Sequence, residues 1–152
     1  MQDLYKTPQA NLDGNEENKS YDFQLYKISG IGLATFVGSA LAGGFLISQN
    51  YKRLGNVRMA NKALTYSVIA TITLFLIAYF IPEDMNIPNI VFTIVQVVAL
   101  VQIAKQQQEK ELSDHVAHGG ALASNWKAFG ISLLVLLVML MVLIPVIMLT
   151  VE

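Results

Sequence analysis

The sequence predicts an all-α integral membrane protein, a four-helix bundle whose third helix protrudes beyond the bilayer into the cytoplasm. Only 14% of the 152 residues are charged, against roughly 25% in a typical soluble chain. Four windows carry no charge at all, namely 28–51, 63–82, 85–104 and 128–151. Each is long enough to span a membrane, because about 20 helical residues cross a hydrocarbon core of roughly 30 Å. The windows lack the alternation that a barrel strand needs.

The composition excludes several classes of function. There is no cysteine, which excludes disulfides, thiolate metal sites and a cysteine nucleophile. The formal net charge of −1 argues against a nucleic-acid partner. The chain contains no P-loop, Rossmann fingerprint, G-x-S-x-G or H-E-x-x-H motif. We therefore expect no cofactor and no nucleic acid, and the lipid bilayer is the first expected partner.

A polar N-terminal tail, residues 1–27, precedes the transmembrane domain, which takes up residues 28–152. Pro8, Gly14 and a cluster of Asn, Asp and Glu predict that the tail is largely flexible. Tyr26 lies just before the first apolar window and is expected to anchor the chain at the membrane interface. The alternative is that the tail docks on a partner or on the outer face of the protein itself.

Small residues mark the first helix, which is expected over about 28–49. Four of them follow each other at i+4 and so share one helix face, and two more widen the stripe. They are Gly30, Ala34, Gly38, Ala42, Gly43 and Gly44. Small residues let helix backbones approach closely in a membrane, so the stripe predicts packing within the bundle. A homo-oligomer contact is the first alternative, and the lining of a pore is the second.

The second helix, expected over about 60–82, lies between a basic and an acidic connection. The basic connection, residues 49–62, contains no acid, and its charges are Lys52, Arg53, Arg58 and Lys62. The acidic connection is the tight turn 83–86, in which Asn86 suits the N-cap of the next helix.

The third helix is predicted to begin near residue 87 and to continue past the end of its apolar window. Residues 105–118 are rich in Lys, Gln and Glu and contain no Gly or Pro, which favours an uninterrupted helix. Gly119 and Gly120 then supply a helix end. The third helix therefore spans about 87–104 and extends to 118.

The fourth helix, expected over about 125–150, is the most apolar of the four. Leu, Val and Met dominate it, so lipid can surround most of its circumference. Trp126 and Lys127 at its start are expected to be interfacial anchors. Pro145 lacks an N–H group and predicts a bend towards the end of the helix.

The distribution of Lys and Arg predicts the orientation in the membrane. The connection 49–62 carries four Lys and Arg residues, and segment 105–127 carries three. The opposite side carries only Lys6, Lys19 and Lys27. Short loops rich in Lys and Arg face the cytoplasm. Both loops are therefore expected in the cytoplasm, and both termini outside.

One cluster in the extension of the third helix has the spacing of a metal site. Glu111, His115 and His118 fall at i, i+4 and i+7 on one helix face, with Asp114 beside them. Carboxylate and imidazole groups could hold a divalent cation there, although a further ligand would have to come from water or another subunit. We interpret the cluster as a solvated helix face, and expect no bound metal and no catalytic residue.

The predicted spans contain no charged side chain, which argues against an ion-coupled transporter. Gln96 lies midway along the third span. It is expected to form an interhelical hydrogen bond, with a contact to a substrate as the alternative.

Three stretches carry a resemblance to a known group of proteins. They are Tyr5–Leu12, the run GSALAGGFLISQNYKRLG at 38–55 and the run HVAHGGALASNWKAFGI at 115–131. Together they resemble a small, uncharacterised family of four-helix bacterial inner-membrane proteins. The resemblance implies a bacterial inner membrane and implies no activity.

Three functions follow, in order of preference. The first is a membrane scaffold or accessory subunit that contacts an unidentified membrane or cytoplasmic protein. The second is a homo-oligomeric channel or carrier for a neutral solute. The third is a membrane enzyme with a site near His115, which would need a second catalytic cluster that the sequence does not contain. A non-enzymatic role is therefore favoured.

Overall fold

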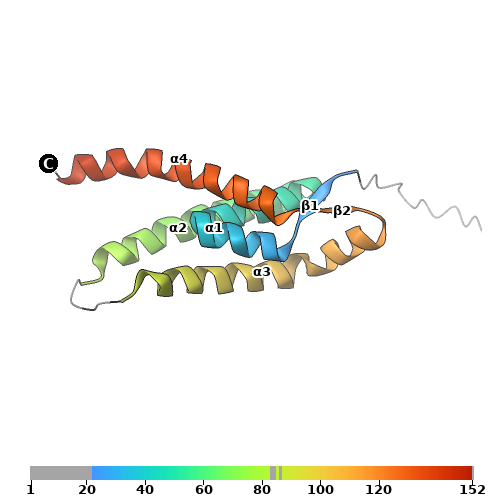
Figure 1. Cartoon of the computed structure of the whole chain (residues 1–152), viewed down its shortest axis with the longest axis horizontal. Helices are drawn as coiled ribbons and strands as arrows, with labels where there is room; N and C mark the ends of the chain where they lie inside the picture. Colours follow the sequence, from blue (N-terminus) through green and yellow to red (C-terminus); the bar gives the residue numbers. More distant parts are fainter. Residues whose placement is uncertain (1–21, 83–84, 86, 152) are drawn as a thin grey trace, which may run out of the picture.

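The computed structural model describes residues 22–82, 85 and 87–151. Its helices and strands, in chain order, are β1 Gln24–Tyr26, α1 Ile28–Arg53, α2 Val57–Phe80, α3 Asn89–Ala117, β2 Ala121–Ala123 and α4 Asn125–Val151 (Figure 1). The prediction of an all-α protein with four helices is confirmed, and all four are candidate membrane spans by length and composition alone. Most of the predicted tail, and Asn86 with its predicted cap, lie outside the described residues.

The helix α1 is broken in the middle and folds back on itself. Gly38 and Ser39 leave the helical conformation, with φ −116° and ψ 20° at Gly38 and φ 66° and ψ −175° at Ser39. A first arm, residues 28–37, and a second arm, residues 40–53, therefore run in opposite directions, and both have their far ends near β1 (Figure 1). We call this pair of arms the hairpin.

Contacts between residues far apart along α1 establish the reversal. The N–H of Tyr26 donates to Asn50 Oδ1 at 2.7 Å, and Asn50 Nδ2 donates to the Tyr26 carbonyl at 2.9 Å. In a straight helix, 24 residues would separate these groups by about 36 Å at 1.5 Å per residue. Nearer the tip, a Cβ on Gly43 would lie 2.0 Å from Thr35 Oγ1. The chain must therefore turn back between Thr35 and Gly43.

The predicted helix over 28–49 is therefore not one continuous rod, because the chain reverses at Gly38 and Ser39. At 1.5 Å per residue the two arms are about 15 and 21 Å long, and neither crosses a hydrocarbon core of roughly 30 Å. The uncharged window is long enough for one crossing, but composition carries no information about chain direction. The arrangement is three helices of spanning length around one re-entrant hairpin.

The hairpin forms the centre of the molecule. The helices α2, α3 and α4 each pack on α1 and hardly touch one another. Accordingly, α1 buries most of its apolar window, whereas the other three helices expose most of theirs. The core contains Ile31 and Ala34 of the first arm and Leu46 and Ile47 of the second.

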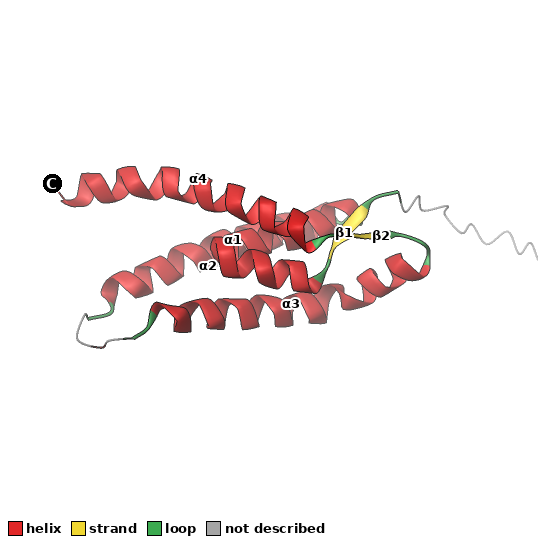
Figure 2. Ribbon diagram, viewed as in Figure 1, coloured by secondary structure: helices red, strands yellow, loops and turns green. Residues whose placement is uncertain are grey.

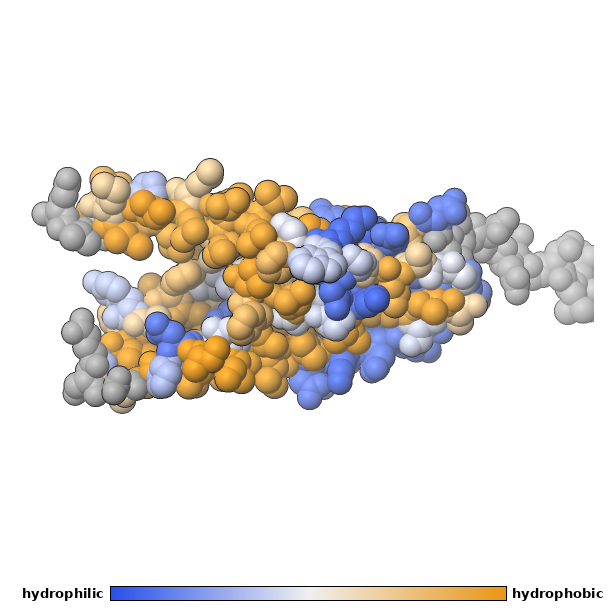
Figure 3. Space-filling model, viewed as in Figure 1, coloured by the Kyte–Doolittle hydropathy of each residue, from blue (hydrophilic) through white to orange (hydrophobic). Residues whose placement is uncertain are grey.

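A two-stranded parallel sheet closes one end of the bundle. Leu25 of β1 pairs with Leu122 of β2, so the segment before α1 is joined to the segment between α3 and α4 (Figure 2). This end, which we call the polar end, also contains the start of α2. The opposite end, the apolar end, contains the end of α2, the start of α3 and the end of α4. Apolar side chains cover most of the bundle towards the apolar end (Figure 3).

The described ends of the chain, Asp22 and Val151, lie at opposite ends of the bundle. The hairpin returns α1 to the end from which it started. The location of the two termini relative to a membrane stays a prediction.

The helix α3 runs without interruption to Ala117, and Gly119 follows it with a φ of 83°. Its last turns do not project freely, however. Gln108, Leu112 and His115 are buried, and β2 packs beside them. The extension of α3 is therefore part of the closed polar end.

Candidate functional site

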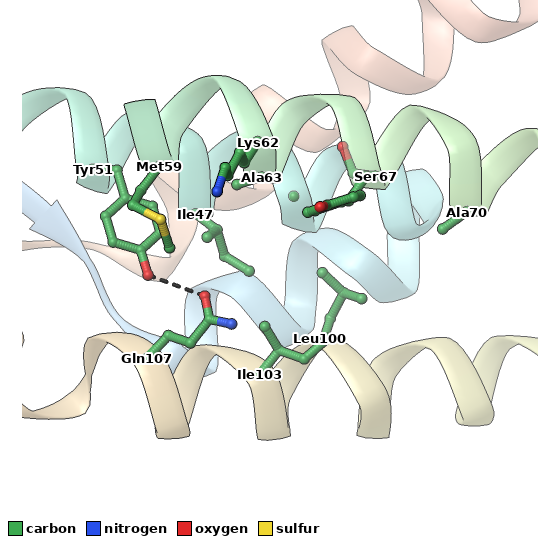
Figure 4. Close-up of a pocket in the computed structure, with 12 residues that line it drawn as sticks. Ile47, Tyr51, Met59, Lys62, Ala63, Ser67, Ala70, Leu100, Ile103 and Gln107 are labelled. Atoms are coloured by element: carbon green, nitrogen blue, oxygen red, sulfur yellow. Dashed lines mark hydrogen bonds between the residues drawn. The ribbon is translucent and has the colours of Figure 1, made fainter. Parts of the chain in front are cut away.

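A groove lies between α2 and α3, with the second arm of the hairpin as its floor (Figure 4). It has a volume of about 430 Å³. Three small residues of α2, Ala63, Ser67 and Ala70, line it at i, i+4 and i+7. These positions share one helix face, and their short side chains leave the space open. We call this cavity the α2–α3 groove.

The walls and the floor of the α2–α3 groove are apolar along most of its length. Leu100 and Ile103 of α3 face the small residues of α2, and Ile47 lies beneath them. On the floor, a Cβ on Gly44 would lie 2.2 Å from Ser67 Cβ, so only glycine lets the second arm approach α2 this closely. The groove is suited to a hydrocarbon chain.

Polar groups gather where the groove reaches the polar end. The hydroxyl of Tyr51 donates to Gln107 Oε1 at 3.0 Å and links the second arm to α3 (Figure 4). Lys62 lines the groove from α2, and within the described part of the chain no hydrogen bond or ion pair engages its amino group. The groove therefore combines an apolar channel with one free ammonium group at its mouth.

A buried polar network, which we call the polar junction, holds the base of the hairpin together. Asn50 is 0% exposed and bonds both backbone groups of Tyr26. Its Nδ2 also donates to Gln108 Oε1 at 3.0 Å, and Gln108 Nε2 donates to the carbonyl of Ile47 at 3.0 Å. Buried polar groups are stabilising only when they are satisfied, and here each bond joins two different segments.

The cluster predicted as a solvated helix face is divided by the structure. His118 and Asp114 are exposed, and His118 Nδ1 donates to the carbonyl of Asp114 at 2.7 Å. His115 is only 1% exposed, so the prediction of a solvated side chain is wrong there. It is stacked on Phe23 at 4.8 Å, and its Nε2 lies 3.2 Å from the carbonyl oxygen of Ala121. The burial arises because β2 folds back over α3.

A metal centre is not assembled from these residues. Among the described residues no three His, Asp or Glu side chains lie close enough to hold a metal ion. Glu111 lies beyond the apolar window of α3 and is half-buried. Burial raises the pKa of the Glu111 carboxyl above its ordinary value, because a charged carboxylate is disfavoured away from water.

The six small residues predicted to pack in a stripe are all buried. They do not form one face, because the break separates Gly30 and Ala34 from the rest. A Cβ on Gly30 would lie 3.2 Å from Ala128 Cβ on α4, and one on Gly38 would lie 2.9 Å from the carbonyl oxygen of Ser132. Gly30 and Gly38 thus approach α4 within the same chain.

The predicted interfacial anchors differ in their surroundings. Trp126 is 81% exposed at the start of α4, and Lys127 Nζ donates to Gln24 Oε1 at 3.2 Å. Tyr26 is only 3% exposed, so it does not fit the predicted role at the interface. Its ring lies beneath the guanidinium of Arg53, whose carbon is 4.9 Å from the ring centre, and Arg53 also donates to the carbonyl of Gln24.

The Lys and Arg residues of the described chain lie on segments that form or approach the polar end. The basic connection contributes Lys52, Arg53, Arg58 and Lys62, and the other segments contribute Lys27, Lys105, Lys110 and Lys127. With the hairpin folded back, Lys27 lies at the same end as the basic loops.

Sequence reasoning missed Asn50, Gln108 and the α2–α3 groove. The three small residues of α2 were a readable signal for the groove, whereas nothing in the sequence pairs Asn50 with Gln108. A comparison of the chain with family models, with curated proteins and with solved structures finds no match.

Proposed function

We propose that this chain is a non-enzymatic, multi-pass protein of the bacterial cytoplasmic membrane that binds an anionic lipid in the α2–α3 groove. The observation that carries the proposal is the free ammonium of Lys62 at the polar mouth of an otherwise apolar groove. The groove lies between two helices of spanning length. A lipid could therefore enter sideways from the bilayer.

The dimensions of the groove agree with a lipid chain. From Met59 to Ala70 it extends about 16 Å along α2 at 1.5 Å per residue. Burial of each methylene of an acyl chain contributes about 0.8 kcal/mol. At the mouth, Tyr51 and Gln107 offer further polar contacts for a headgroup.

The charge distribution supports a cytoplasmic position for the polar end. Lys and Arg are enriched in cytoplasmic loops, and those of the described residues gather at this end. The predicted orientation placed Lys27 outside, against the usual distribution of basic residues. With the hairpin folded back, Lys27 lies at the end that we propose to be cytoplasmic. Anionic lipids of the cytoplasmic leaflet attract such groups by about 1 kcal/mol for each Lys or Arg near the surface.

Removal of the ammonium at the groove should weaken lipid binding selectively. We expect Lys62→Gln to lower the affinity for phosphatidylglycerol by about fivefold, which corresponds to about 1 kcal/mol. Ala70→Leu should lower it as well, because the larger side chain fills the groove. Binding is measured on the purified full chain in mild detergent, from the rise in unfolding temperature as the lipid is added.

Two matched variants serve as controls. Lys52→Gln removes an exposed charge at the same end, and Thr73→Leu enlarges an exposed side chain of the same helix. Neither residue lines the groove, so neither change should alter lipid binding. If Lys52→Gln weakens binding as much as Lys62→Gln, the lipid is held by general charge rather than in the groove.

The predicted role as a scaffold or accessory subunit is a second candidate, and one observation favours it. Beyond the tip of the hairpin, a cavity of about 230 Å³ opens between α2 and α4, with Phe75 and Val142 in its apolar walls. A gap between the two helices in Figure 3 leads into this region. A helix of a partner protein, or of a second copy, could fill it.

Site-specific photocrosslinking in native membranes tests this candidate. With the crosslinker at Val142, inside the cavity, we expect one discrete adduct of higher mass. With the crosslinker at exposed Leu134, which lies outside this cavity, we expect none. An adduct of two identical chains would indicate a homo-oligomer. The absence of protein adducts from Val142 would exclude a partner helix at this position.

A further inference from the structure

The tip of the hairpin carries polar groups in the middle of the apolar part of the molecule. Gln96 Oε1 accepts a hydrogen bond from the N–H of Ala40 at 2.9 Å, which confirms the predicted interhelical bond of Gln96. The break at Ser39 exposes the N-terminus of the second arm, which is 14 residues long. Irregular backbone at membrane depth is tolerated only where protein buries it or where it lines a cavity.

A separate cavity of about 160 Å³ lies against this tip, between α2 and α3. Ser39, Thr71 and Gln96 line it, together with the rings of Phe75 and Phe92. At roughly 30 Å³ per water molecule, the volume equals about five waters. Asn89 at the start of α3 also lines it, so the cavity extends towards the apolar end. We call it the tip cavity.

An unsatisfied hydroxyl distinguishes the tip cavity from ordinary helix packing. Thr71 is only 7% exposed, yet its Oγ1 is buried and has no hydrogen-bond partner. A buried hydroxyl without a partner is destabilising. In helices such a group is usually satisfied by the carbonyl of the preceding turn. A molecule held in the adjoining cavity would be placed to supply the missing bond.

We propose that the tip cavity binds a small uncharged polyol, which enters from the apolar end. The Thr71 hydroxyl can both donate and accept, and the amide nitrogen of Gln96 offers a donor because its oxygen already bonds Ala40. The hydroxyl of Ser39 already donates to Met139 Sδ and accepts from the N–H of Leu41. No charged side chain lines the cavity, so nothing would balance the charge of an ionised solute.

The chemistry of the walls and of the hairpin fits a polyol. Hydroxyl groups would meet Thr71 and Gln96, while the C–H faces would lie against Phe75 and Phe92. Towards the polar end the two arms are packed together and buried. The site is therefore closed towards the polar end. Ser39 holds a conformation that non-glycine residues rarely adopt, and such strain is typical of binding sites.

A valine in place of Thr71 tests the proposal, because it keeps the shape of the side chain and removes only the hydroxyl. Without ligand, Thr71→Val should raise the unfolding temperature, since an unsatisfied buried group is lost. Glycerol is the probe, observed by saturation-transfer NMR on the full chain in detergent micelles. The signal of bound glycerol should fall at least fivefold in Thr71→Val.

Two comparisons make the result decisive. Thr73→Val, on the exposed side of the same helix, should leave both the unfolding temperature and the glycerol signal unchanged. Sorbitol, a longer polyol, should give a weaker Thr71-dependent signal than glycerol. Equal glycerol signals from wild type and Thr71→Val would overturn the proposal. A loss of stability in Thr71→Val without ligand would also overturn it, because the hydroxyl would then be satisfied within the protein.

The outcome does not depend on the lipid groove. The tip cavity and the α2–α3 groove share no lining residue, so failure of one proposal leaves the other standing.

Discussion

Replacement of Gly43 by alanine is expected to lower the free energy of unfolding in detergent by about 1–3 kcal/mol, the usual cost of overpacking. In the hairpin the new Cβ would lie 2.0 Å from Thr35 Oγ1 and 3.2 Å from Thr35 Cβ. The two arms would have to separate. An exposed helical glycine behaves in the opposite way, because alanine is favoured over glycine by about 1 kcal/mol in a helix.

A second substitution should rescue the first. Thr35→Ala removes the Oγ1 atom with which the new Cβ of Gly43→Ala would clash. The double variant should therefore recover most of the lost stability. The recovery is specific to the hairpin. In a straight helix, positions 35 and 43 would lie about 12 Å apart at 1.5 Å per residue and could not interact.

Gly130→Ala is the matched control, because nothing lies within 4 Å of a Cβ at that position on α4. It should be neutral or slightly stabilising. If Gly43→Ala proves as harmless as Gly130→Ala, or if Thr35→Ala adds to its effect instead of relieving it, the two arms are not in contact. The first window would then be a single span.

The helices were predictable because the information for them is local. The uncharged windows and the helix-forming residues after Ala104 specify where helices run, and Gly119 specifies where α3 ends. The direction of the chain inside a window is not local information. A single Gly38-Ser39 pair reverses it, and the same two residues would be unremarkable in a straight membrane helix.

Two features of the sequence do agree with the reversal once it is known. If the first window were a single span, Lys27 would lie beside it on the side of the membrane opposite the basic loops. The reversal places Lys27 on the same side as those loops. Ser48, Gln49 and Asn50 end the window with polar groups. These groups would be costly inside the bilayer, but at the base of a re-entrant hairpin they reach its edge.

The polar sites required the tertiary structure. Asn50 and Gln108 are 58 residues apart, and a lone Asn or Gln in a membrane helix predicts some partner without naming it. The burial of His115 depends on β2, a strand of three residues that has no hydrophobic alternation to reveal it. Helix existence could thus be predicted, but the contacts that make the sites could not.

The polar junction should be the most sensitive point of the polar end. Asn50→Ala would leave the N–H and carbonyl of Tyr26 and the side chain of Gln108 without their partner. Each buried group left unsatisfied costs about 1–3 kcal/mol. We therefore expect a loss of at least about 3 kcal/mol in the free energy of unfolding, measured by denaturant titration in detergent.

The control is Asn61→Ala, which removes the same side chain from an exposed position on α2 and should change stability by less than about 0.5 kcal/mol. A second measurement, hydrogen exchange, distinguishes loss of the polar junction from a general loss of stability.

Asn50 joins the base of the second arm to Tyr26, which lies just before the first arm. Loss of Asn50 should therefore open the polar end before the bundle unfolds. Backbone amides of residues 24–26 and 121–123 should then exchange hydrogen faster in Asn50→Ala, while those in the middle of α2 keep their protection. If hydrogen exchange becomes faster to the same extent along the whole chain, Asn50 stabilises the whole fold and not only the base of the hairpin.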